Sequence, residues 1–164
     1  MADLSPQDEA LVAAAFDERI ALAIPHQAGC GGTAPSRGKI GESVQRINSS
    51  FPHWFNDRFK RFGDQPERLP FDQHELVALV APRPVLFTNA VDDQWANPSG
   101  QFDVLKAASP VYKFLGLKGL QADRMPETGT LLHGDLGYWI RPGKHSMTPD
   151  DWTVFLDFTD RHFR

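Results

Sequence analysis

The stretch "GYWIRPGKHSMTPDDW", residues 137–152, shows how the C-terminal part of the chain folds. Its apolar residues 138–140 predict a strand, which ends at a Pro-Gly turn. A helix begins shortly afterwards, because Thr148 is a suitable N-cap, a proline follows it, and Asp151 completes a capping box. The stretch therefore predicts a strand, a short loop that presents His145, and a helix.

The same alternation of helix and strand runs through the rest of the chain. We expect helices over residues 4–19, at both ends of 41–62 with an interruption at Pro52, over 70–82, over 101–116 with a bend or break near Pro110, and from 148 onward. We expect strands over residues 20–24, 84–90 and 136–143. This order predicts an α/β fold with about three parallel strands and flanking helices. In the last helix, Trp152, Phe155 and Leu156 are expected to form the inner face.

Composition narrows the classes of protein that the chain can belong to. Its 164 residues suit one domain, with 41% hydrophobic and 23% charged residues and a net charge of −4. Scattered Lys and Arg residues argue against a nucleic-acid or anionic membrane surface. No apolar run approaches the ~20 residues that span a bilayer. The N-terminus shows no secretory signal, and a single cysteine, Cys30, allows no internal disulfide or cysteine-based zinc site.

Polar residues follow the carboxyl ends of the expected strands, where ligands bind in parallel sheets. The three loops span residues 26–37, 92–99 and 143–146. His145 in the last loop is a candidate general base, and Asp93 in the second is its candidate acid, since a catalytic imidazole needs a carboxylate on its other nitrogen. Two alternatives stay open: Asp92 and Asp93 form an ordinary Asx-turn, and His145 is a solvated loop residue.

Five segments in order give a more specific indication. "IPHQAGCGGTAPSR", "ESVQRINSSFPHWF", "LPFDQHELVALVAPRPVLF", "DDQWANPSGQF" and "GYWIRPGKHSMTPDDW" together resemble the carboxyl-terminal half of bacterial glucuronoyl esterases, carbohydrate esterase family 15. The resemblance implies an α/β-hydrolase with a serine triad, neither metal nor other cofactor, and glucuronate esters of xylan as substrates. Relatives are also described as acetyl xylan esterases, so the acyl group stays open.

The resemblance also implies roles for particular residues. His145 matches the catalytic base and Asp93 the acid, while Trp95 matches a tryptophan that stacks on the glucuronate. Glu42 matches a glutamate that contacts the sugar hydroxyls. Gln27 stands where other members carry an alternative acid, and an amide cannot take that role.

The nucleophile of the family has no counterpart here. Its Gly-x-Ser-x-x-Gly turn would fall near residues 4–8, which read "LSPQD", and Ser5 looks like a helix cap. We therefore expect residues 1–164 to form a single partial α/β-hydrolase domain that is inactive alone. The alternative hypothesis is a non-catalytic domain that binds a sugar acid or serves in assembly.

Loss of the neighbouring strand would expose the edge of the segment from Arg19 to Pro25, so we expect homo-oligomers formed through that edge. The expected ligand is a carbohydrate, with no nucleic-acid or membrane partner. Localisation stays unassigned: the chain shows no signal peptide, whereas the resemblance implies secreted or periplasmic relatives.

The remaining candidates are weaker. His53 and Trp54 are expected to pack near the helix break or to line a cleft, and His26 to line the site or to satisfy a backbone carbonyl. Cys30 is a poor nucleophile because no cation or helix start stands nearby in the sequence to lower its pKa. Because the histidines show no close pairing, no metal site is expected.

Overall fold

The computed structural model describes residues 6–38 and 40–164. Ser5, the expected cap of the first helix, lies outside these residues. The helices are α1 (Pro6–Phe16), α2 (Val44–Ser50), α3 (Asp57–Lys60), α4 (Gln73–Val80), α5 (Pro98–Phe114) and α6 (Pro149–Phe163), with short 3-10 turns η1 (Pro66–Arg68) and η2 (Gln94–Ala96).

A small mixed sheet lies at the centre of the fold. Strand β1 (Val85–Ala90) pairs in parallel with β3 (Leu136–Arg141), and the two-residue strand β2 (Leu131–Leu132) adds to β3 in the antiparallel direction. Both long strands are buried along their whole length, although they include polar residues, namely Thr88 and Asn89 in β1 and Arg141 in β3. The strands expected over 84–90 and 136–143 are confirmed, whereas β2 was not predicted.

Residues 20–24 differ from the prediction, because they form no regular strand. Isolated parallel bridges join Ala23 to Val85 and His26 to Thr88, so this segment lies along β1 on the side away from β3. Pro25 between the bridges has no N–H to donate, which prevents a continuous ladder. The segment is still placed beside β1, as a parallel arrangement requires.

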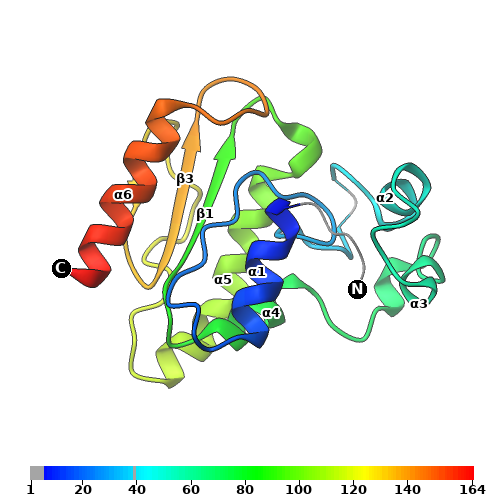
Figure 1. The fold of residues 1–164 in the computed structure, drawn as a ribbon, viewed down its shortest axis with the longest axis horizontal. Helices are drawn as coiled ribbons and strands as arrows, with labels where there is room; N and C mark the ends of the chain where they lie inside the picture. The colour runs from blue at the N-terminus through cyan, green and yellow to red at the C-terminus, as the bar shows by residue number, and fades with distance from the viewer. Residues whose placement is uncertain (1–5, 39) are drawn as a thin grey trace.

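Helices cover both faces of the sheet (Figure 1). On one face, α1, α4 and α5 pack over the side chains of Val85, Phe87 and Tyr138. On the other face, α6 covers Leu86 and Trp139. Helices α2 and α3 lie at the end of the molecule remote from α6, around a separate small cluster of buried residues.

Two expectations about the helices were wrong in part. Helix α5 continues without a break through Pro110, which is exposed, so the proline removes one helical hydrogen bond at the surface. In α6, Phe155 is buried as expected, but Trp152 and Leu156 are 56% and 62% exposed. In the described part of the chain, no helix combines the length and apolar character needed to cross a bilayer.

Candidate active site

The loops that follow β1 and β3 begin side by side. Beyond the last paired residues, Ala90 and Arg141, the N–H of Val91 donates to the Arg141 carbonyl at 2.9 Å, and the N–H of Asp92 donates to the Gly143 carbonyl at 3.0 Å. The parallel ladder thus extends into both loops. This extension brings the residues that follow the two strands to one edge of the sheet.

Asp93 and His145 meet at this edge. Nδ1 of His145 lies 2.7 Å from Oδ2 of Asp93, and since the carboxylate accepts, the ring nitrogen donates. The other carboxylate oxygen of Asp93 accepts the N–H of Ala96, 3.3 Å away, which caps η2 and fixes the carboxylate. Asp93 is buried, whereas the side chain of His145 is 53% exposed. The imidazole therefore has one nitrogen on a fixed carboxylate and Nε2 available for proton transfer.

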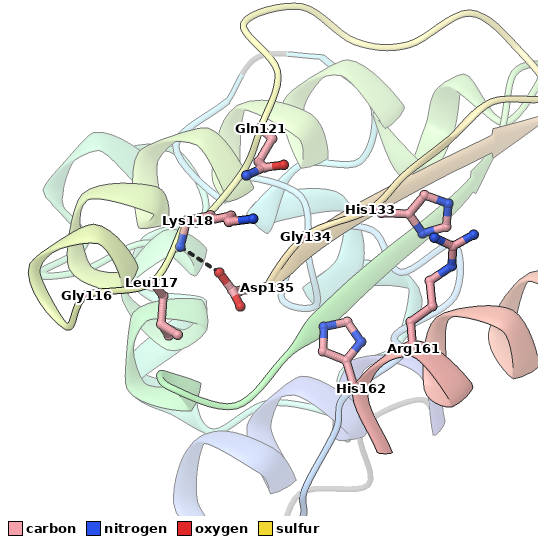
Figure 2. Close-up of a pocket in the computed structure, with 9 residues that line it drawn as sticks. All are labelled: Gly116, Leu117, Lys118, Gln121, His133, Gly134, Asp135, Arg161 and His162. Atoms are coloured by element: carbon pink, nitrogen blue, oxygen red, sulfur yellow. Dashed lines mark hydrogen bonds between the residues drawn. The ribbon is translucent and has the colours of Figure 1, made fainter. Parts of the chain in front are cut away.

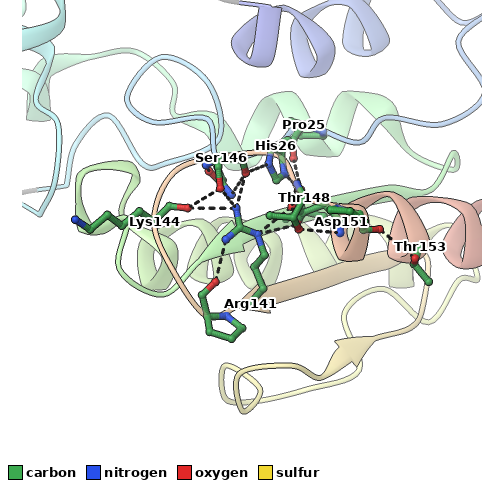
Figure 3. Close-up of polar contacts among 12 residues, drawn as sticks. Pro25, His26, Arg141, Lys144, Ser146, Thr148, Asp151 and Thr153 are labelled. Carbon is green, nitrogen blue, oxygen red and sulfur yellow. Dashed lines mark hydrogen bonds and ion pairs between the residues drawn. The ribbon is translucent and has the colours of Figure 1, made fainter.

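A buried ion pair supports the loop that carries His145. The guanidinium of Arg141 donates through Nε to Asp151 at 2.9 and 3.1 Å, and both side chains are almost fully buried. Arg141 also donates to the carbonyls of Pro142 and Lys144 and to the hydroxyl and carbonyl of Ser146 (Figure 3). One side chain thus holds the backbone on both sides of His145.

The same aspartate also caps helix α6. Its carboxylate accepts hydrogen bonds from the N–H and hydroxyl of Thr148, and the predicted capping box is confirmed. Burial raises the pKa of Asp151, but the bonds from Thr148 and Arg141 more than offset this effect and hold the pKa below its usual range. Asp151 therefore stays ionised and joins the start of α6 to the loop.

The segment after Pro25 reaches the same loop from the other side. Nε2 of His26 donates to the Ser146 carbonyl at 2.9 Å, and its Nδ1 lies 2.8 Å from the Thr88 hydroxyl. His26 thus satisfies a backbone carbonyl, one of its two expected roles, beside the candidate base. Gln27 pairs with the backbone of Ser146 and not with the ring of His145.

Trp95 and Glu42 are brought together by their backbones. The N–H of Glu42 donates to the Trp95 carbonyl at 2.9 Å. This close approach requires Gly41, where φ is +76° and a β-carbon would stand 2.5 Å from the same carbonyl oxygen. The Trp95 ring is 46% exposed, and the guanidinium carbon of Arg46 lies 5.2 Å from its centroid. Glu42 thus adjoins Trp95, which stands two residues after Asp93, and a cation that the sequence analysis missed lies beside the Trp95 ring.

The sequence analysis identified neither Arg46 nor Arg141. Arg46 carries no local motif, and its partner Trp95 is distant in the sequence. The partners of Arg141 are near, since Ser146 and Asp151 lie five and ten residues away, but no known motif links them. One signal was present for Arg141. It ends the apolar run "GYWI", and a charged residue there is buried only if it is paired.

The weaker candidates lie elsewhere or are buried. Cys30 is buried in the cluster around α2, and Trp54 stacks on Phe51 with ring centroids 3.8 Å apart, while His53 is exposed. Across residues 6–38 and 40–164, no three His, Cys, Asp or Glu side chains gather as a metal ion would require.

Two cavities stand apart from the pair formed by Asp93 and His145. One, of about 430 Å³, lies at the amino end of β3 and is lined by polar residues that include Lys118, His133 and Arg161 (Figure 2). The other, of about 660 Å³, is mostly apolar and lies between α1 and the segment around α3. His145 lies beyond the carboxyl end of β3, so the cavity in Figure 2 is at the opposite end of that strand.

In α/β-hydrolases the acid and the histidine of the catalytic triad follow successive strands of a sheet that has helices on both faces, and Asp93 and His145 follow β1 and β3 in the same order. The fold is accordingly that of an α/β-hydrolase. Comparison with known proteins agrees. A family model described as "Glucuronyl esterase, fungi" matches residues 7–116.

Individual relatives give the same result. Carbohydrate esterase MZ0003, from an unknown prokaryotic organism, is 50% identical over 152 residues, which cover 93% of this chain and 35% of that protein. The 4-O-methyl-glucuronoyl methylesterase of Phanerochaete carnosa is 36% identical over 115 residues, covering 66% of this chain and 28% of that protein. The structure of a promiscuous CE15 esterase from a marine bacterial metagenome superposes with a TM-score of 0.94 at 48% identity, over 96% of this chain and 40% of that one.

The chain belongs to the glucuronoyl esterase family. The glucuronoyl esterase of Solibacter usitatus superposes with a TM-score of 0.92 at 36% identity, over 98% of this chain and 41% of that one. The chain spans about a third of the curated relatives' length and about two fifths of the solved structures.

Proposed function

We propose that the chain is a partial α/β-hydrolase domain that supplies the base and acid of a serine carboxylic-ester hydrolase acting on glucuronate esters of plant cell-wall xylan. The 2.7 Å hydrogen bond between His145 and Asp93 carries this proposal. The name of the Phanerochaete carnosa relative, a 4-O-methyl-glucuronoyl methylesterase, supports the substrate class.

In the proposed mechanism, Nε2 of His145 takes the proton from a serine hydroxyl as the oxygen attacks the ester carbonyl. Asp93 fixes the tautomer with Nε2 unprotonated and stabilises the imidazolium that forms. His145 then gives the proton to the departing alcohol, which leaves the serine acylated by the glucuronate. Water next attacks the acyl carbon while His145 takes its proton, and His145 returns that proton to the serine oxygen as the glucuronate leaves. Trp95 stacks on the sugar and Glu42 accepts hydrogen bonds from its hydroxyls, as the family resemblance implies.

The serine is proposed to come from outside these 164 residues, since the sequence holds no Gly-x-Ser-x-x-Gly turn. The chain alone should then show no hydrolysis of a methyl glucuronate ester. Turnover by the chain alone that is lost in Cys30→Ala or Ser5→Ala would contradict the proposal and identify another nucleophile.

A hybrid enzyme tests the roles directly. This chain replaces the matching segment of carbohydrate esterase MZ0003, and release of methanol from a methyl glucuronate ester is followed. His145→Ala and Asp93→Asn should each lower kcat by about 10⁴-fold or more. Trp95→Ala should mainly raise KM. His74→Ala, which changes a partly exposed histidine on α4, serves as the control and should leave the rate unchanged. A His145→Ala hybrid as active as the parent would overturn the assignment.

A second candidate function is binding of a sugar acid without catalysis, because the exposed ring of Trp95 and the adjacent Arg46 suit an acidic sugar. Calorimetric titration of the chain alone with glucuronate, against Trp95→Ala, tests this candidate. We also propose that the chain forms homo-oligomers through the edge from Arg19 to Pro25.

A further inference from the structure

Gln27 and Ser146 form a two-point contact although 119 residues separate them. The side-chain Oε1 of Gln27 accepts the N–H of Ser146 at 2.9 Å, and its Nε2 donates to the Ser146 carbonyl at 3.0 Å. Gln27 is 2% exposed, and its own N–H donates to the Thr88 carbonyl at 2.8 Å. Strand β1 thus holds Gln27, and Gln27 holds the peptide groups of the residue that follows His145.

The chemistry of this contact requires an amide. The backbone of Ser146 presents one donor and one acceptor, and a primary amide presents the matching acceptor and donor. A carboxylate has no donor, so it would set a negative oxygen against the Ser146 carbonyl and leave that half of the contact unmade. Arg141 and His26 also donate to this carbonyl (Figure 3), so with Gln27 three side chains in all bind it.

The imidazole of His145 depends on its backbone for orientation, because its side chain is half exposed and packing holds it weakly. We infer that Gln27 is a positioning residue: its amide fixes the Ser146 peptide and thereby directs Nδ1 of His145 at Asp93. The inference rests on the proposed function in one respect, namely that His145 is the base.

The tautomer of His145 provides the test, because it reports the direction of Nδ1 and needs no activity. The 164-residue chain is labelled with ¹⁵N-histidine, and long-range ¹H–¹⁵N spectra are recorded at about pH 8, above the usual histidine pKa of about 6.5. The His145 signal is assigned by its loss in His145→Ala. In the unmutated chain we expect the Nδ1–H tautomer. Asp93→Ala should lose the Nδ1–H tautomer, because free imidazole favours the Nε2–H form. Its spectrum serves as the reference for the other variants.

Gln27→Glu and Gln27→Met are the two test variants. Both keep an unbranched side chain at a position where φ is +52°, so neither adds backbone strain. Each should lose most of the Nδ1–H population. Gln73→Glu is the matched control, because Gln73 is also a buried glutamine whose Nε2 donates to a backbone carbonyl, that of Gly32 at 2.6 Å. It should keep the tautomer of the unmutated chain.

The outcomes separate the two proposals. If the unmutated chain already shows the Nε2–H tautomer, the pairing of Asp93 with His145 fails, and the proposed function and this inference fall together. If it shows Nδ1–H and both Gln27 variants keep it, the positioning role is overturned while the proposed function stands. If circular dichroism shows that neither variant folds, Gln27 is a general stabilising residue and the positioning role is likewise overturned.

Discussion

His26 is enclosed where three segments of the chain meet. Its ring contacts the Ser146 carbonyl and the Thr88 hydroxyl, and it packs edge-on against Phe155 with ring centroids 5.6 Å apart. Burial lowers the pKa of His26 below its usual value, against the opposing effects of the Ser146 carbonyl and Asp151. The positive charge of Arg141 lowers it further. His26 is therefore neutral in the folded protein at neutral pH.

Stability should fall in mild acid for this reason. The unfolded chain binds a proton at His26 near pH 6.5, whereas the folded chain binds it only at lower pH, so stability rises with pH between these two values. The stabilisation that depends on neutral His26 is fully present above about pH 6.5. It is lost as the pH falls toward the lower pKa of His26 in the folded chain. Thermal unfolding at pH 7.5 and 5.5 should show a lower Tm at the acid pH.

The same melts on His26→Gln should show a smaller difference between the two pH values, because the variant has no imidazole to protonate. His74→Gln, which changes a partly exposed histidine, should retain the full difference. An undiminished difference in His26→Gln would show that the acid sensitivity arises elsewhere, and His133 is then the next candidate, since burial lowers its pKa too.

Among individual residues, the sequence predicted those that follow the strands, but not those that hold the loops in place. Asp93 and His145 each stand a few residues beyond an apolar run. They are therefore found by the rule that functional residues follow the carboxyl ends of parallel strands. The roles of Gln27 and Arg141 depend on Ser146, and for Gln27 that partner lies more than a hundred residues away. A local pattern contains no information about such a contact.

Helix α6 lies against the sheet at a position where only glycine fits. In β3, Gly137 faces α6, and a β-carbon there would stand 2.4 Å from the ring of Phe158, which is fully buried. It would also stand 3.0 Å from the side chain of Leu86 on β1. The absence of a side chain at this position sets how closely the helix approaches the sheet.

Gly137→Ala should therefore destabilise the protein by about 1–3 kcal/mol, because the ring and helix must shift to admit the methyl group. Urea unfolding followed by circular dichroism measures the change. Gly63→Ala is the control, since the nearest atom to a β-carbon there is 3.4 Å away, and it should change the free energy of unfolding by less than about 0.5 kcal/mol. Equal effects in both variants would refute this packing argument.

The order and ends of the elements were largely predictable, whereas the orientation of α6 was not. Caps and prolines mark helix ends locally, and Thr148 with Asp151 did so correctly. The prediction of the inner face was wrong for Trp152 and Leu156, which were chosen because they are apolar. The buried side of α6 includes Asp151 instead, which is paired with Arg141. A polar residue on the inner face cannot be recognised without its partner.

Over the whole molecule, apolar surface is exposed in several places. Phe16 at the end of α1 is 75% exposed and borders the apolar cavity, and Trp152 and Leu156 add exposed surface on α6. The segment before Pro25 bonds to β1 through Ala23, so in a parallel arrangement the peptide groups of the residues beside Ala23 face away from β1. Such an edge is a template for pairing with another chain.

We therefore expect self-association, most simply as a two-fold dimer. Light scattering at micromolar concentration should give a mass above that of the monomer. Ala21→Lys places a charge on the exposed edge and should shift the mass toward the monomer. Ala107→Lys makes the same change at an exposed position on α5 and should have no effect. A monomer mass for the unmutated chain would refute this expectation.

The six residue pairs of β1 and β3, buried along their whole length, have a consequence for the exchange of amide hydrogens with deuterated solvent. Because these amides reach solvent only when the sheet separates, their exchange rate measures the opening of the entire fold. The Ser146 amide is held by a side chain and lies in a loop, so it is released by smaller fluctuations. The exchange rate of the Ser146 amide, divided by the rate of an unprotected amide, gives the fraction of molecules in which its contact with Gln27 is open.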